Sequence, residues 1–295
     1  MSVLRHWLVT LLLATSLAGC TAATFFAVNL PASLGHYQRT TDVDYGAAIH
    51  QQLDIYQPDI NQPGASLSDG TSPGLRPVVI FIHGGSWASG SKKQYLFVGS
   101  TLAAQGYVAV LPNYRLSPAV RFPVFVEDAA LAVAWTLREI SRYGGDPHRV
   151  YLMGHSAGAH IAMLVALDRH YLADDGATAD DLRGVIGLSG PYAFAINSRL
   201  LRKVFGSAAD PGLTQPVNFV RGDAPPILLI HGTDDHVCDV RNSIELSDRL
   251  IAAGTPVELR LFDGLGHSDT VAALSPLSRH HRQVLAELRR FIAAH

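Results

Sequence analysis

A regular alternation of short apolar runs with longer amphipathic segments restricts this chain to a small set of folds. The apolar runs are rich in β-branched side chains, as expected of strands that are buried on both faces of a sheet. They occupy residues 78–82, 107–111, 150–153, 185–188, 227–230 and 257–262. Amphipathic segments lie at residues 124–140, 157–167, 240–253 and 276–294. Strands that alternate with helices predict right-handed crossovers, and therefore an α/β fold with a mostly parallel central sheet and helices on both faces.

The rest of the chain predicts one domain behind an N-terminal extension. Residues 40–43 and 50–56 predict a two-stranded hairpin, and residues 57–77 are rich in Pro and Gly, which indicates a loop. The chain contains no internal repeat and no second core-forming block, so we expect a single domain over residues 38–295. Charged residues make up 16% of the chain and hydrophobic residues 48%, which favours a large buried core over disorder.

Charge and cysteine content exclude several classes of protein. The formal net charge is −2, so the chain lacks the basic surface that a nucleic-acid phosphate backbone requires. With 2 cysteines in the chain there is neither a disulfide framework nor a pair spaced like a zinc site. Cys238 is interpreted as a buried packing residue.

The first residues are typical of a targeting signal. Arg5 provides a positive start, residues 7–17 form an apolar run, and small residues precede Cys20. The run is too short to span a bilayer, which takes about 20 apolar residues. Residues 17–20 (LAGC) resemble the bacterial lipobox, in which the cysteine is lipidated and the signal is cleaved just before it.

This interpretation predicts a lipoprotein anchored in the cell envelope. Residues 1–19 would be the signal peptide, Cys20 the lipidated residue, and residues 20–37 a tether of little periodicity. Thr21 in place of Asp after the cysteine fits the sorting pattern that sends many such lipoproteins to an outer membrane. The alternative is an ordinary signal peptide with a chance cysteine at its end.

Residues 154–158 read GHSAG and lie directly between a predicted strand and a predicted helix. In this context the serine of G-x-S-x-G sits on a strained elbow with its hydroxyl exposed. Glycines flank it because the tight turn leaves no room for a Cβ. The helix N-terminus behind Ser156 adds partial positive charge where an oxyanion would form. Ser156 is therefore the candidate nucleophile; the alternative is a serine that only caps the helix.

A serine hydroxyl is a weak nucleophile until a base accepts its proton, so a histidine and an orienting acid are expected further along the chain. Residues 231–235 (HGTDD) and 264–267 (GLGH) each follow a predicted strand. The carboxyl ends of parallel strands meet at one edge of a sheet, so both loops should lie near Ser156. His267 is the candidate base, and the acid is Asp234 or Asp235.

Several other polar residues compete for a role. Asp239, Asp263 and Asp269 are lesser candidates for the acid, and His160 is interpreted as structural. His231, Asp234 and His236 could be read as metal ligands, but so short a loop gives them no fixed geometry. We expect no metal and no cofactor.

Residues 83–87 (HGGSW) follow the predicted strand 78–82. Adjacent glycines let the backbone approach a substrate with no side chain in the way. Backbone N–H groups in such a loop can hold an oxyanion, which needs donors about 3 Å from the reacting oxygen.

Together these motifs resemble the carboxylesterase branch of the α/β-hydrolases, near the hormone-sensitive-lipase-like and feruloyl-esterase-like esterases, the kynurenine formamidases and the prenylcysteine methylesterases. The resemblance includes residues 53–58, 113–116 and 144–147 and so extends over residues 38–295. It implies an α/β-hydrolase fold with a small cap or none.

The resemblance also implies roles for individual residues. The family's acid ends an H-G-x-x-D loop, which selects Asp235 over Asp234. The oxyanion hole falls to the N–H groups of Gly85, Ser86 and Ala157, within a motif that His83, Gly84 and Trp87 complete. Ser86 stands where lipases of the H-G-G-G type have glycine, which favours the H-G-G-x-W subgroup. Trp87 is expected to pack the loop.

The implied activity is hydrolysis of small-molecule carboxylic esters through a Ser-His-Asp triad and an acyl-enzyme. One alternative is an amidase of the arylformamidase type, against which the lipobox argues because tryptophan breakdown is intracellular. Another is a prolyl-oligopeptidase-type peptidase, for whose propeller domain the chain is too short. A third is a non-catalytic surface binding protein on a hydrolase scaffold. The sequence does not give the oligomeric state.

Overall fold

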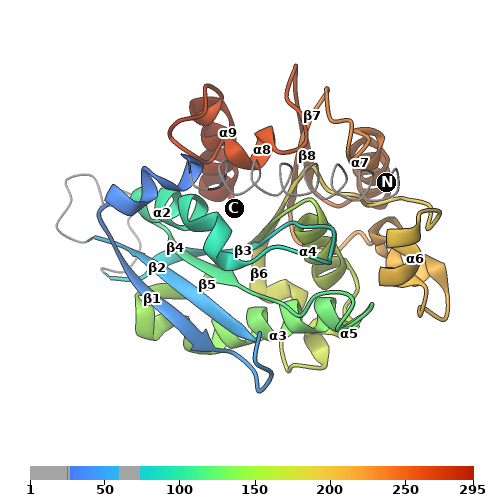
Figure 1. Cartoon of the computed structure of the whole chain (residues 1–295), viewed down its shortest axis with the longest axis horizontal. Coiled ribbons are helices and arrows are strands. Elements are labelled where there is room, and N and C mark those ends of the chain that lie inside the picture. Colours follow the sequence, from blue (N-terminus) through green and yellow to red (C-terminus); the bar gives the residue numbers. More distant parts are fainter. Residues whose placement is uncertain (1–24, 26, 60–73) are drawn as a thin grey trace, which may run out of the picture.

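A mostly parallel β-sheet runs through the middle of the molecule (Figure 1). The computed structural model describes residues 25, 27–59 and 74–295. Their 8-stranded sheet has the order β1-β2-β4-β3-β5-β6-β7-β8. Antiparallel pairing is limited to β1 (Tyr37–Asp44) with β2 (Gln52–Pro58), and β2 with β4 (Val108–Pro112). The other pairs are parallel, which confirms the predicted fold class.

The remaining strands are β3 (Arg76–Ile82), β5 (Gly145–His155), β6 (Leu182–Leu188), β7 (Ile227–Gly232) and β8 (Val257–Phe262). Strands β3 to β7 are largely buried, as their apolar runs predict. The prediction was wrong for β8, whose residues are half-buried and whose Leu261 is 44% exposed. This strand ends the sheet and pairs with β7 alone, so part of its surface faces solvent.

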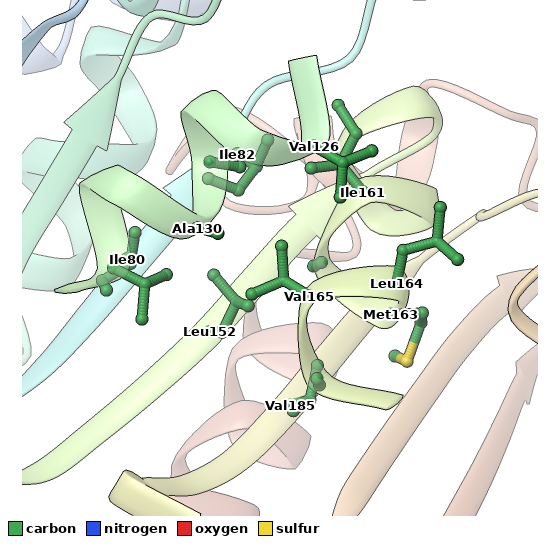
Figure 2. Close-up of a cluster of buried hydrophobic side chains, with 14 of the residues drawn as sticks. Ile80, Ile82, Val126, Ala130, Leu152, Ile161, Met163, Leu164, Val165 and Val185 are labelled. Carbon is green, nitrogen blue, oxygen red and sulfur yellow. The ribbon is translucent and has the colours of Figure 1, made fainter. Parts of the chain in front are cut away.

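Helices cover both faces of the sheet (Figure 1). One face is packed by α3 (Val124–Glu139), α4 (Ala157–Leu167) and α7 (Arg241–Ala253). The other is packed by α2 (Leu96–Ala104) and α9 (His281–Ala294). Figure 2 shows the hydrophobic core on the first of these faces, where side chains of α3 and α4 interdigitate with those of the sheet. Close packing on both faces holds the strand ends in place.

Shorter helices lie in the connections between these elements. They are α5 (His170–Ala173), α6 (Arg199–Phe205) and α8 (Asp269–Ala272), with the 3₁₀ turns η1 (Ala32–Leu34), η2 (Lys92–Tyr95), η3 (Ile140–Tyr143), η4 (Ala179–Asp181), η5 (Pro211–Thr214) and η6 (Pro216–Phe219). Helix α9 begins at His281 rather than at residue 276, because turns precede it. Helix α2 has no sequence signal, because it is apolar and buried on nearly every side.

The described part of residues 20–37 packs against the domain, although the sequence predicts a tether there. The side chain of Asn29 donates from Nδ2 to the Gln94 carbonyl at 3.0 Å and accepts from the Phe97 N–H at 2.9 Å. Ser275 donates to the carbonyl of Val28 at 3.2 Å. These specific hydrogen bonds fix the segment, because a side-chain amide satisfies two backbone groups at once. The signal peptide and Cys20 lie outside the described residues.

Candidate active site

The turn between β5 and α4 has the geometry of a strained elbow. Ser156 has φ 54° and ψ −121°, which is costly for a residue with a Cβ, and its N–H donates to the Leu188 carbonyl at 2.9 Å. A Cβ on Gly154 would lie 2.2 Å from the Gly158 oxygen, and one on Gly158 would lie 2.0 Å from the Ile82 oxygen. Both glycines are therefore required by close backbone approach, as the sequence predicts.

Hydrogen bonds join Ser156, His267 and Asp235 in a line. His267 Nε2 lies 2.8 Å from Ser156 Oγ, and His267 Nδ1 lies 2.8 Å from Asp235 Oδ2. The carboxylate only accepts, so Nδ1 carries the proton and Nε2 accepts from the serine hydroxyl. The imidazole is therefore in the tautomer that can take the hydroxyl proton.

Asp235 is buried, and its carboxylate is surrounded by N–H donors. The N–H groups of Val237 and Cys238 donate to Oδ1 at 2.9 and 2.8 Å, while His267 and His231 reach Oδ2. Burial acts to raise the pKa of Asp235, but the hydrogen bonds from His231, His267 and the Cys238 N–H outweigh it and hold the pKa well below its usual range. Asp235 is therefore ionised at neutral pH.

The other aspartates named from the sequence have different partners. Asp234 is exposed. Asp239 pairs with Arg241, Asp263 accepts from Thr233, and Asp269 accepts from the Gly266 N–H. Among these acids, Asp235 is the one that contacts His267.

The HGGSW loop lies against the elbow. A Cβ on Gly84 would lie 3.3 Å from the Cβ of Ser156, and Ser86 and Trp87 line one pocket with Ser156. Within the described residues, the N–H groups of Gly85, Ser86 and Ala157 donate to no other protein group. These donors are therefore free to bind an oxygen beside Ser156.

His155, the residue before the candidate nucleophile, supports the loop of His267. Its Nε2 lies 3.0 Å from the His267 carbonyl, and the two ring centroids are 5.1 Å apart. Desolvation by burial, followed by the charge of His267, lowers the pKa of His155 to about 3. His155 therefore stays neutral and donates to that carbonyl.

A pocket of about 230 Å³ opens beside Ser156 and His267. Its walls are mainly apolar and include Trp87, Pro191, Phe194, Leu200, Leu201 and Val237. Asp239 and Asn242 add polar groups, and Cys238, buried as the sequence indicates, completes one side. Most of this lining comes from the segment 191–201 and from the loop after Asp235, neither of which carries a sequence motif for a pocket wall.

Trp87 and His160 connect the pocket to that segment. The Trp87 Nε1–H donates to His160 Nδ1 at 3.2 Å, so His160 Nε2 carries the proton that the Thr214 carbonyl accepts at 2.8 Å. Burial lowers the pKa of His160 to about 4. Trp87 is 5% exposed and stacks on Phe194 with ring centroids 5.9 Å apart. Trp87 therefore both packs the loop, as predicted, and forms part of the pocket wall.

No cluster of three or more His, Cys, Asp or Glu side chains within the described ranges is arranged to hold a metal ion. His231, considered as a ligand with Asp234 and His236, instead contacts Asp235 and Ser243. In the same part of the chain, no helix is both long and apolar enough to cross a bilayer.

Comparison with protein families gives two matches. The family described as BD-FAE matches residues 53–250, and the prolyl oligopeptidase family matches residues 212–295. Isoprenylcysteine alpha-carbonyl methylesterase ICME from Arabidopsis thaliana is 32% identical over 247 residues, which are 76% of this chain and 55% of that protein. Esterase LipC from Mycobacterium tuberculosis is 32% identical over 211 residues, or 65% of this chain and 52% of LipC. The chain spans about half the length of these curated relatives.

Solved structures show the same fold. Esterase B from Lactobacillus rhamnosis superposes with a TM-score of 0.76 at 23% identity, over 96% of this chain and 94% of that one. The apo form of Thermogutta terrifontis esterase 2 gives 0.71 at 22% identity, over 88% and 94%.

Proposed function

The chain belongs to the BD-FAE family of α/β-hydrolase carboxylesterases, and from this premise we propose that it is a serine carboxylesterase in which Ser156, His267 and Asp235 are the catalytic residues. The observation that carries the proposal is the line of hydrogen bonds from Ser156 through His267 to Asp235, next to unpaired backbone N–H groups. Nucleophile, base and acid are then assembled beside an apolar pocket.

The proposed reaction follows from these positions. His267 Nε2 takes the Ser156 proton as Oγ bonds to the ester carbonyl carbon, and the N–H groups of Gly85, Ser86 and Ala157 bind the oxyanion. His267 then gives that proton to the leaving alkoxide as the ester C–O bond breaks. Water attacks the acyl-serine by the same route, which releases the acid and restores Ser156. Asp235 stays ionised and stabilises the His267 imidazolium.

Two measurements test this function. The purified protein is assayed with p-nitrophenyl esters and with N-formylkynurenine, and it is treated with a p-nitrophenyl alkylphosphonate, which transfers its phosphonyl group to an activated serine. We expect ester turnover and a phosphonyl adduct on Ser156 in the digested protein. If the protein shows no turnover and forms no adduct, the esterase function is rejected, and a binding protein on a hydrolase scaffold remains. Faster turnover of the formamide than of any ester would favour an arylformamidase.

We further propose that the ester substrate has a short or moderately sized acyl group. The pocket of about 230 Å³ supports this, because it lies below the 300–1,000 Å³ typical of sites for drug-sized ligands. Its apolar walls favour an uncharged acyl or alcohol group.

We also propose that the protein is a lipoprotein of the cell envelope, anchored at Cys20. The lipobox-like residues 17–20 support lipidation. Phe25 contacts Tyr95 with ring centroids 5.5 Å apart, and five residues span at most about 18 Å. The linker between the lipidated Cys20 and the domain would then be short, and the domain would lie close to the membrane surface.

A further inference from the structure

Two imidazoles share one oxygen of Asp235. His267 Nδ1 lies 2.8 Å from Oδ2, and His231 Nε2 lies 3.1 Å from the same atom. His231 Nε2 also lies 2.9 Å from the carbonyl oxygen of Cys238. Both partners of Nε2 are acceptors, so this nitrogen carries a proton and donates to them.

Ser243 fixes the other side of the His231 ring. His231 Nδ1 lies 2.7 Å from Ser243 Oγ, and both residues are 0% exposed. In the neutral ring with Nε2 protonated, Nδ1 accepts from the Ser243 hydroxyl. A hydroxyl on the first turn of α7 therefore orients an imidazole on β7, as a hydrogen bond at one ring nitrogen commonly does for the other.

The charge of Asp235 depends on these donors. Its side chain is 0% exposed, and within the described residues its ion-pair partners are the two histidines rather than Lys or Arg. Its stabilisation comes from N–H groups: two from the backbone, one from His267 and one from His231. His231 is thus the one side-chain donor to Asp235, in the described chain, that does not also contact Ser156.

We propose that His231 is a positioning residue for catalysis: its Nε2–H, oriented by Ser243, takes up part of the negative charge on Asp235 Oδ2 and holds the carboxylate turned toward His267. The inference rests on the proposed function, because it assigns His231 a role within the same site. Without this donor more negative charge stays on Oδ2, so the His267 cation is bound more strongly. The carboxylate also loses one of the contacts that hold its orientation.

Three titratable groups beside Asp235 and His267 keep one charge state between about pH 5 and 9: His155, Cys238 and Asp239. Burial keeps the pKa of His155 low, at about 3, and raises the pKa of the Cys238 thiol. The hydrogen bond with Arg241 lowers the pKa of Asp239 to about 2. A displaced acidic limb in the pH profile of kcat/KM would therefore not come from these three groups, and the NMR titration of His267 assigns it.

The test compares His231→Gln with His231→Leu. A glutamine amide can donate to both Asp235 and Cys238 while its oxygen accepts from Ser243, whereas leucine removes all three contacts. For His231→Leu we expect kcat to fall about 10- to 100-fold with KM little changed, and the acid limb to move up by about half to one pH unit. His231→Gln should restore most of both. A histidine NMR titration of His267 should show the same displacement and requires no turnover.

Ser243→Ala and Asn242→Ala provide a matched pair on adjacent residues of α7. Ser243→Ala should displace the acidic limb of the pH profile of kcat/KM in the same direction by a smaller amount. This variant tests the role of His231 even if His231→Leu does not fold. Asn242 accepts from the N–H groups of Tyr192 and Ala193 at 2.9 Å and holds the pocket wall. Asn242→Ala should raise KM and leave the acidic limb of the pH profile of kcat/KM in place.

Equal acid limbs and equal His267 titrations in the Leu, Gln and unsubstituted proteins would overturn the role of His231. A lack of ester turnover in the unsubstituted protein would instead overturn the proposed function, and the NMR titration would still decide whether His231 tunes the Asp235–His267 pair.

Discussion

The indole N–H of Trp87 donates to Nδ1 of His160, which places the last residue of the HGGSW motif in contact with the first turns of the helix that follows Ser156. His160 continues this connection to the Thr214 carbonyl, and Phe194 stacks on the same indole. The His160 imidazole and the Trp87 indole thus hold three parts of the molecule together. These are the loop next to Ser156, the core helix α4 and the segment that forms the pocket wall. Their relative positions set the shape of the pocket.

Trp87→Phe should therefore weaken both stability and substrate binding. The change leaves Nδ1 of His160 without its donor and opens a small cavity, which together cost about 2–4 kcal/mol. We expect urea melts to show that loss and KM to rise more than kcat falls. Trp135→Phe is the control, because Trp135 is half-buried on α3 and packs on Tyr143 away from the pocket. If the two variants had the same KM, Trp87 would have no part in the wall.

Asp235→Asn should lower kcat by about 10⁴, because an amide can present an N–H to His267 and favour the wrong tautomer. Ser156→Ala or His267→Ala should lower it by about 10⁴ to 10⁶, since either change removes the activated nucleophile. The exposed Asp234 is the matched control, and Asp234→Asn should retain near-normal turnover. Turnover of p-nitrophenyl acetate measures all four variants, and a large loss in Asp234→Asn alone would show the acid to be misassigned.

The sequence predicts the elements that have strong local patterns. The strand–GHSAG–helix order gives the elbow, because only a tight turn between such elements needs both Gly154 and Gly158. Sheet topology follows from the strand–helix alternation. Choosing Asp235 over Asp234 required the family resemblance, because both follow β7 in the same loop and only tertiary contacts distinguish them.

Features that depend on tertiary packing were not predictable in the same way. Helix α2 is buried almost all round and so lacks the amphipathic period that identifies surface helices. Phe194 and Val237 come from loops without a motif, and they line the pocket only because α7 and the segment 191–201 meet there. The contacts of Asn29 with Gln94 and Phe97 join parts of the chain far apart in sequence, which local patterns do not report.

Acyl preference should follow the size of the pocket. Each buried methylene contributes about 0.8 kcal/mol, or about fourfold in kcat/KM, until the pocket is full. We expect kcat/KM for p-nitrophenyl esters to rise over the first few carbons and then to level off. Leu201→Ala enlarges the pocket and should move the optimum to a longer acyl chain, whereas Leu213→Ala, at an exposed side chain of η5 outside the pocket, should not. A rise that continues past about twelve carbons would contradict an open, small site.

Stability should fall as the pH drops below about 6.5. Burial lowers the pKa of His83 to about 4, of His155 to about 3 and of His160 to about 4. The unfolded chain takes up protons at these sites near pH 6.5 while the folded chain does not, so the stability present above that pH is lost as the pH falls toward 4. Each histidine contributes a slope of up to about 1.4 kcal/mol per pH unit.

Urea melts at pH 7, 6 and 5 measure this slope before the carboxylates protonate. His160→Gln should reduce the slope of the unfolding free energy against pH by the contribution of one titrating group, because a glutamine side chain does not titrate. His280→Gln is the control, since His280 lies outside the core and its ring contacts the side chains of Arg279 and Gln283 at the surface. A free energy of unfolding that is flat from pH 6.5 to 5 would show that the three buried imidazoles are already protonated or solvated in the folded protein.

Cys20→Ser should release the protein from the membrane of its own host without affecting catalysis. If the thiol carries a diacylglyceryl group and the new amino group is acylated, two or three chains anchor the protein stably, whereas a single chain is marginal. Detergent phase separation and mass spectrometry of the N-terminal peptide measure the change, and kcat/KM of both forms should agree within about twofold. Cys238→Ala is the matched control, because Cys238 is buried beside Asp235 and its loss should leave partitioning intact. Recovery of the unsubstituted protein in the soluble fraction with Cys20 as a free thiol would show that this chain is not a lipoprotein.

The short span from Cys20 to Phe25, which packs on Tyr95, adds a second expectation. A flexible linker of about 20 residues inserted between Cys20 and Phe25 should make the membrane-anchored domain more accessible to protease, while the lipid anchor persists.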